Sequence, residues 1–200
     1  AQQICIGLKE SPEEEPMDKK VKGELLIGFA KLIRSAKDLP WENYLLPEDM
    51  ELVKQMVLPG TWYPAESYQR MALASWELIA RRNPALVHQF GKQAMNEMLK
   101  GPYRPLLDRN DPYEAIVKFL TLRRTLFNFS RNDTEMVGEK KLQVKISEFG
   151  KFEGVEVYTI YIKAHLEVLV EFNAGKEPKV EIQSTEDQGE PVYVFNVEWK

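Results

Sequence analysis

The side chains that most often carry metal or nucleophilic chemistry are scarce in this chain. Its 200 residues include one cysteine, Cys5, and two histidines, His88 and His165. One cysteine cannot form an intramolecular disulfide, and these three residues are too few for a zinc ribbon or an iron–sulfur cluster. The sequence also contains no Gly-x-Ser-x-Gly hydrolase motif and no glycine-rich phosphate loop. We therefore expect a protein that is not an enzyme and that holds no metal or cofactor. An enzyme of unrecognised chemistry is the lesser alternative.

Aromatic side chains gather around two expected helices, over residues 48–56 and 64–82. They are Trp41, Tyr44, Trp62, Tyr63 and Tyr68. Pockets for apolar ligands are lined mostly by aromatic and aliphatic side chains with a few polar groups. We therefore take Trp41, Trp62, Tyr63 and Tyr68 as candidate ligand-binding residues. Ordinary packing of the core and of helix ends is the alternative.

Basic side chains lie on and around the helix expected over residues 112–129. They are Arg104, Arg109, Lys118, Arg123, Arg124 and Arg131. Converging guanidinium groups can hold a carboxylate or a phosphate, although a charged outer helix face would look the same. Arg123 and Arg124 are the candidates, because they interrupt a strongly apolar helix.

The two histidines have different surroundings in the sequence. His88 shares a helical face with Lys92 and is expected to be partly exposed. His165 lies among apolar residues, so it is either a ligand-binding residue or a buried histidine bonded to a carbonyl group.

The elements that must position these side chains fall into two groups. Apolar residues recur every three or four positions in the first part of the chain, which is typical of amphipathic helices. This pattern predicts helices over residues 23–36, 48–56, 64–82, 84–100 and 112–129. Residues 142–146 alternate between apolar and polar, which predicts a strand. Residues 153–173 fit a helix better than a strand, because about 20 residues would be long for one strand. Two final strands, around residues 180–182 and 192–199, are expected to form an antiparallel hairpin.

This order of elements predicts an α+β fold, with an N-terminal helical part followed by a small antiparallel sheet and one long helix. Residues 23–200 are expected to form a single domain. Residues 1–22 are rich in charge and proline and are expected to be a flexible arm or a linker from an upstream domain.

Composition limits the function further. The net charge of −4 disfavours general nucleic-acid binding. No run of about 20 apolar residues could span a membrane, and the N-terminus lacks the order of a secretory signal. We expect a cytoplasmic protein without membrane insertion.

From Gly23 onward the order of landmarks resembles the haem-NO-binding (H-NOX) family. These landmarks are Lys22-Gly23, Trp41, Tyr63-Pro64, Phe90-Gly91 and Phe119-Leu120. The resemblance implies the fold shared by NO sensors, four-vinyl-reductase-like domains and Golgi-transport subunits. A paralogous family of myxobacterial proteins is similar in further motifs, namely Gly60 to Pro64 with Tyr68, Asp111 to Glu114 with Leu122-Arg123, Ala174-Gly175, and Phe195 to Trp199.

The residues that hold haem in the H-NOX family do not occur in this chain. The resemblance places the axial histidine at Phe127, and no histidine lies between His88 and His165. The family's Tyr-x-Ser-x-Arg motif for the haem propionates has no counterpart in residues 142–148. We therefore expect a haem-free, non-enzymatic sensory or ligand-binding domain for an apolar or amphipathic small molecule in bacterial signalling, with Phe127 among the pocket residues. The alternative is a protein–protein adaptor that binds a protein partner or forms a homodimer and holds no ligand.

Overall fold

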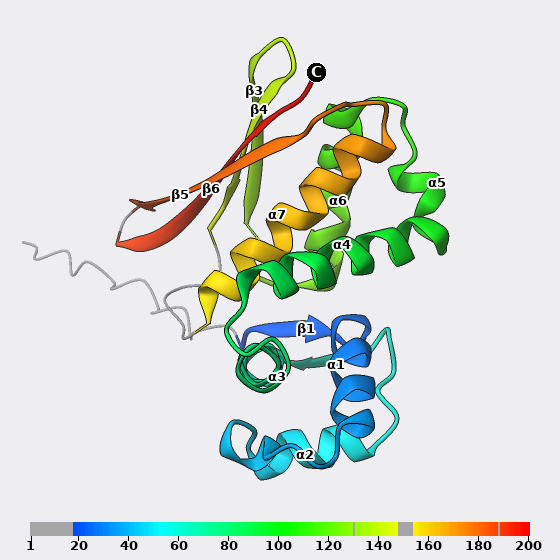
Figure 1. The fold of residues 1–200 in the computed structure, drawn as a ribbon, viewed down its shortest axis with the longest axis vertical. Coiled ribbons are helices and arrows are strands. Elements are labelled where there is room, and N and C mark those ends of the chain that lie inside the picture. Colours follow the sequence, from blue (N-terminus) through cyan, green and yellow to red (C-terminus); the bar gives the residue numbers. More distant parts are fainter. Residues whose placement is uncertain (1–17, 130, 148–153, 188) are drawn as a thin grey trace, which may run out of the picture.

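A computed structural model describes residues 18–129, 131–147, 154–187 and 189–200. The N-terminal helices form one layer, which lies against α4 and α7, and the larger sheet packs on the other side of α6 and α7 (Figure 1). This arrangement is the α+β fold expected from the sequence. None of the described helices combines the length and hydropathy needed to cross a membrane.

The N-terminal layer contains three helices and a two-stranded sheet. Strand β1 (Lys20–Lys22) leads directly into α1 (Gly23–Ser35), and β2 (Trp62–Pro64) leads directly into α3 (Ala65–Leu78). The two strands pair in antiparallel register, with Val21 opposite Tyr63. Between them lie a short 3-10 helix (Trp41–Asn43) and α2 (Pro47–Lys54).

Three helices follow the N-terminal layer. They are α4 (Pro84–Lys100), α5 (Arg104–Leu107) and α6 (Pro112–Leu126). The Asn83 side chain accepts a hydrogen bond from the Ala85 backbone N–H at 3.0 Å, and Asp111 accepts one from Glu114 at 3.0 Å. Each of these two caps precedes a proline at the first helical position, which confirms two of the expected helix starts.

The second part of the chain is a four-stranded antiparallel sheet and one long helix. The strands β3 (Asn132–Gly138), β4 (Lys141–Ile146), β5 (Lys179–Asp187) and β6 (Glu190–Glu198) are arranged in the order β3-β4-β6-β5. Helix α7 (Val155–Phe172) connects β4 to β5. The predictions of a helix over residues 153–173 and of a terminal hairpin are confirmed for the described residues.

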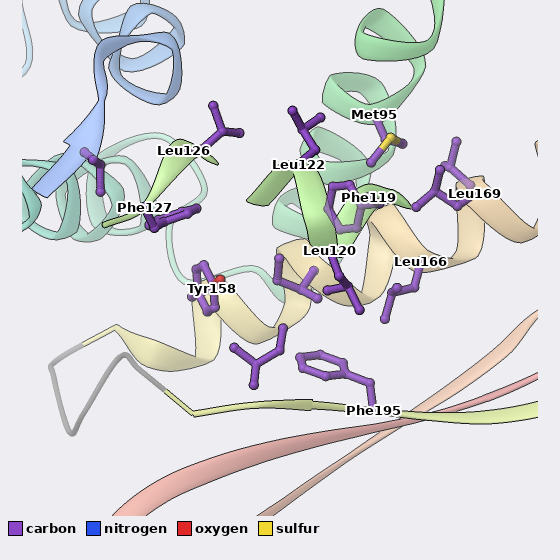
Figure 2. Packing of buried hydrophobic residues seen from close by; sticks show 14 of the residues in the cluster. Met95, Phe119, Leu120, Leu122, Leu126, Phe127, Tyr158, Leu166, Leu169 and Phe195 are labelled. Atoms are coloured by element: carbon purple, nitrogen blue, oxygen red, sulfur yellow. The ribbon is translucent and has the colours of Figure 1, made fainter. Parts of the chain in front are cut away.

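The core joins helices and sheet. Phe195 of β6 is fully buried and lies below Leu120 of α6 and Leu166 of α7, whereas Phe119 of α6 lies nearer to Met95 of α4 (Figure 2). Helix α4 packs closely on α7, because Gly91 has no side chain there. An added Cβ at Gly91 would lie 2.8 Å from the Cβ of Ala164.

The structure differs from the sequence expectations in several short elements. Strands β1, β2 and β3 and helix α5 were not expected. Strand β3 is exposed over most of its length, so its residues carry no apolar alternation, and pairing with β4 determines its conformation. The helix expected to reach Phe129 ends at Leu126, and Phe127 instead forms a β-bridge with Val21. Val21 is fully buried, so ordered structure begins within the range expected to be an arm. Residues 1–17 of that arm lie outside the described residues.

Candidate ligand-binding cleft

Two adjoining cavities lie between the N-terminal helices α1 and α3 and the helices α4 and α7. Their volumes are about 440 Å³ and about 420 Å³. Several residues line both of them, namely Leu25, Gly28, Phe29, Ala72, Ala94, Glu97, Val157 and Tyr161. We refer to the two cavities together as the cleft.

Small side chains on three helices keep the cleft open. Gly28 of α1, Ala72 of α3 and Ala94 of α4 line both cavities. A Cβ added at Gly28 would meet no atom within 4 Å, so this glycine faces open space. A glycine in a helix interior costs roughly 0.5–1 kcal/mol of stability relative to alanine. The chain therefore tolerates a destabilising residue at a place where a larger one would narrow the cleft.

The walls of the cleft are aromatic. Phe29, Tyr68, Tyr158 and Tyr161 line the first cavity. Phe29 and Tyr68 pack edge to face, with ring centroids 5.7 Å apart. The second cavity adds Trp76 and Phe90, together with the aliphatic residues Leu32, Ile79 and Val87.

A buried polar group lies behind the first cavity. The Arg123 guanidinium donates a hydrogen bond to the Tyr158 hydroxyl and stacks over the Phe127 ring, 4.8 Å from its centroid. Burial raises the pKa of Tyr68 to about 12, and the nearby Arg123 charge only partly opposes this shift. The Tyr68 hydroxyl is therefore protonated at neutral pH.

His165 lines the first cavity as a neutral side chain. Burial, together with the smaller effect of the positive charge of Arg123, lowers its pKa from 6.5 to about 3. Among the described residues, neither ring nitrogen has a hydrogen-bond partner. The expectation of a buried histidine is confirmed, but the expected bond to a carbonyl group is not found. Unsatisfied buried polar atoms are rare enough in folded proteins to require an explanation.

Four polar side chains line the first cavity, and we refer to them as the polar rim. They are Glu24, Gln69, Glu97 and Tyr103, of which Glu97 also lines the second cavity. The Tyr103 hydroxyl donates to Glu24 Oε2 at 2.5 Å, and burial together with this carboxylate raises the pKa of Tyr103 to about 12. Glu97 forms an exposed ion pair with Lys100, with Oε1 and Nζ 3.0 Å apart.

The structure brings four of the candidate residues together. Tyr68 and His165 line the first cavity, and Arg123 and Phe127 lie directly behind it. The Phe127 ring packs edge to face on Tyr68, with centroids 6.1 Å apart.

The other four candidates lie away from the cleft. Trp41 is buried, and its indole N–H donates to the Ala36 carbonyl at 2.7 Å. Trp62 is half-exposed beneath the Lys22 ammonium, and the Tyr63 hydroxyl accepts a bond from the Leu58 backbone N–H. Arg124 is exposed and donates to the Asn132 side chain and carbonyl oxygen.

Sequence reasoning did not identify several cleft residues. Phe29, Trp76 and Tyr161 lie on helices far apart in the chain, and each fits an ordinary apolar helix face. The rim residues Glu24, Glu97 and Tyr103 carry no motif. The one informative feature in the sequence is Gly28, a glycine inside an otherwise apolar helix face.

The cleft residues do not fit haem. A metal bound to an imidazole lies roughly 2 Å from the nitrogen, but protein atoms cover both ring nitrogens of His165. Phe127, at the position that the resemblance gives to the axial ligand, has no ligand atom and is buried. The charged groups lining the cleft are carboxylates, whereas haem propionates are bound by cations. No group of three or more histidine, cysteine or acidic residues in the described ranges is placed to hold a metal ion.

The chain matches no protein-family model and no curated protein. It is similar to an oxygen-binding H-NOX domain related to soluble guanylate cyclases, with a TM-score of 0.61, 14% identity, and 90% of this chain and 95% of that chain covered. A mutant H-NOX of T. Tengcongensis gives a TM-score of 0.59 at 14% identity, with 90% and 97% covered. A structure concerned with haem redox potential and porphyrin distortion gives 0.59 at 15% identity, with 88% and 99% covered. The architecture of this chain is therefore the H-NOX fold.

Proposed function

We propose that this chain is a haem-free, non-enzymatic sensory domain that binds an apolar or amphipathic small molecule in the cleft, within a bacterial signalling pathway. The observation that carries the proposal is the cleft itself, which is aromatic, is lined by Gly28, Ala72 and Ala94 on its shared wall, and contains His165, whose ring nitrogens have no hydrogen-bond partner among the described residues. Binding sites of this kind are concave and mostly apolar, with a few polar groups that orient the ligand.

The position of the cleft suits a sensor. It separates the N-terminal layer from α4 and α7, so a ligand there contacts both parts of the fold. The structurally similar H-NOX domains include one described as oxygen-binding. In this chain an apolar or amphipathic organic molecule would bind in the cleft in place of haem, because the residues do not fit haem.

The direct test is titration with Nile red, a neutral apolar dye whose fluorescence rises in apolar surroundings. We expect saturable binding to the purified chain. Ala94 lines both cavities, so the variant Ala94→Phe places a bulky ring in the wall that they share and should reduce dye affinity by about tenfold or more.

The matched control is Ala85→Phe, which makes the same change on an exposed face of α4 outside the cleft. This variant should bind the dye as the parent does. Circular dichroism checks that both variants fold. Equal dye affinity in the two variants would contradict a binding site in the cleft.

The adaptor alternative has its own supporting observation. Large apolar side chains on either side of α2 are exposed, namely Leu46, Met56, Leu58 and Trp62. Exposed apolar surface of this kind is common at protein–protein interfaces. A concentration-dependent dimer in sedimentation velocity, lost in a Met56→Ser/Leu58→Ser variant, together with no dye binding, would favour the adaptor.

A further inference from the structure

We propose that the cleft selects a cationic amphiphile, a hydrophobic amine whose ammonium group lies at the polar rim and whose apolar part extends into the second cavity. This inference rests on the proposed function and specifies its ligand class. It depends on how charge is distributed around the cleft.

The charged residues that line the cleft are all negative. Among the described lining residues of both cavities, Glu24 and Glu97 carry charge, and none is a lysine or an arginine. Tyr103 holds the Glu24 carboxylate by a 2.5 Å hydrogen bond, so this group is already oriented before a ligand arrives. Glu97 has an exposed partner, Lys100, and exposed pairs at this spacing are weak. A ligand ammonium can therefore compete with Lys100 for Glu97.

The aromatic walls favour the same charge. Phe29, Tyr68, Tyr158 and Tyr161 line the cavity that bears the rim. Ring faces attract ammonium groups, and aromatic cages are a common means of binding organic cations. An anionic head group would meet the negative faces of the rings and two carboxylates.

The buried charge behind the cavity gives the ligand a direction. Arg123 lies behind Tyr158 and Phe127 and does not itself line the cavity. Its charge nevertheless acts on Tyr68 and His165, which do line the cavity. Like charges repel, so an ammonium group is more stable at the rim than beside this inner wall. The second cavity, lined by Trp76, Ile79 and Val87, then takes the apolar part.

The site is more than a pair of acidic residues. His165 lines the same cavity, is more than nine-tenths buried, and has two ring nitrogens without a hydrogen-bond partner among the described residues. Its imidazole is neutral, so it adds no second positive charge to the inner wall.

Three molecules of the same chain length separate charge from apolar burial: decylammonium, 1-decanol and decanoate. Each is used below its micelle concentration to displace Nile red at neutral pH and low ionic strength. We expect decylammonium to bind roughly tenfold more tightly than decanol, and decanoate to bind more weakly than decanol. Added salt should reduce the advantage of decylammonium, because exposed charges are screened.

Two double variants locate the charges responsible. Glu24→Gln/Glu97→Gln should lower the affinity for decylammonium to about that for decanol, with both compounds measured on the same variant. Glu42→Gln/Glu135→Gln changes the net charge equally at exposed positions outside the cleft and should retain the preference. Loss of the preference in both double variants would show a general charge effect and would overturn the assignment to the rim.

The remaining outcomes separate the two proposals. Decanoate binding as tightly as decylammonium, with decanol also bound, would overturn the cationic preference and leave the binding cleft in place. Failure of Nile red and all three decyl compounds to bind the parent chain would overturn the proposed function as well.

Discussion

His165 and Tyr161 lie one turn apart on α7, and their rings pack with centroids 4.5 Å apart. Tyr161 thus covers part of an imidazole that has no hydrogen-bond partner among the described residues. Phe119 covers another side, with its ring centroid 5.6 Å from that of His165. Two buried ring nitrogens without a hydrogen bond cost stability, which makes His165 the first position to test.

Replacing His165 with leucine should leave the stability at neutral pH unchanged or raise it by about 1 kcal/mol, because the change removes two buried unpaired nitrogens. The check is urea unfolding of the parent and His165→Leu at the same pH. A loss of several kcal/mol would show that the imidazole makes a favourable interaction in the folded chain.

The same substitution should change the pH dependence. Burial and Arg123 lower the pKa of His165 from 6.5 to about 3, so the unfolded chain binds the proton more readily than the folded chain. The stability that depends on a neutral His165 is therefore fully present above pH 6.5 and is lost progressively as the pH falls towards 3. We expect the parent to lose more unfolding free energy than His165→Leu between neutral pH and about pH 5. Parallel pH profiles would contradict a buried neutral histidine.

The Asp49–Arg70 pair should be a main contributor to the stability of the N-terminal layer. Asp49 is fully buried, and Arg70 donates to both of its carboxylate oxygens, at 2.5 Å and 2.9 Å. Breaking a buried pair by removing one partner commonly costs about 3–5 kcal/mol. Arg70 is partly exposed, so Asp49→Ala should cost about 2–3 kcal/mol of unfolding free energy. The control is Glu51→Ala on the same helix, whose exposed pair with Lys54 should contribute less than about 1 kcal/mol.

Acid should weaken this pair. Burial alone would raise the pKa of Asp49, but the hydrogen bonds from Arg70, Ser67 and Leu46 outweigh it and hold the pKa below its ordinary value of 3.8. The stability from this group is present above that value and is lost as the pH falls further. Asp49→Asn should lack this part of the acid transition in a urea-unfolding series below pH 4. An unchanged acid transition in Asp49→Asn would contradict the assignment.

Two glycines should respond in opposite ways to the same substitution. Gly28→Ala adds a methyl group in open space on a helix and should raise stability by about 0.5–1 kcal/mol. Gly91→Ala places its methyl group 2.8 Å from the Ala164 Cβ and should lower stability by about 1–3 kcal/mol, because α4 and α7 must separate. Thermal unfolding measures both effects. A larger residue, Gly28→Leu, should fold normally but weaken Nile red binding, because it occupies the cleft.

Haem should not bind in a defined site. Protein incubated with hemin and then passed through a desalting column should show no sharp Soret band, because His165 is covered and the lining charges are acidic. The measurement is the absorption spectrum of the parent beside His165→Leu and His88→Ala. A stable Soret band that either variant abolishes would overturn the haem-free function.

The sequence predicts most helices because their boundaries are marked locally. Asn83-Pro84 and Asp111-Pro112 each combine a capping side chain with a proline, and both mark real helix starts. Strand β3 has no such local mark, since most of its residues are exposed and only its pairing with β4 makes it a strand. Phe127 fits a helical pattern locally, but its bridge to Val21, more than 100 residues away in the chain, makes it extended.

The cleft was less predictable than the helices. Spacing shows that α1, α3, α4 and α7 each have an apolar face, but it does not show which of these faces the fold leaves unpacked. Tyr68 and His165 were predicted from residue type alone, because aromatic and histidine side chains are common in binding sites. Trp41 belongs to the same types and proved to be a core residue that donates to Ala36.

The two helices that form the N-terminal side of the cleft both begin at the same two-stranded sheet. Strand β1 continues into α1 and β2 into α3, and the two strands are paired. This small sheet is fastened to the end of α6, because the Lys20 N–H donates to Asn128 Oδ1 at 2.7 Å and the Asn128 N–H donates to the Lys20 carbonyl at 3.1 Å. The first turns of α1 and α3 are therefore held by the same small sheet. A change in the distance between these two helices would have to strain the pairing of β1 with β2.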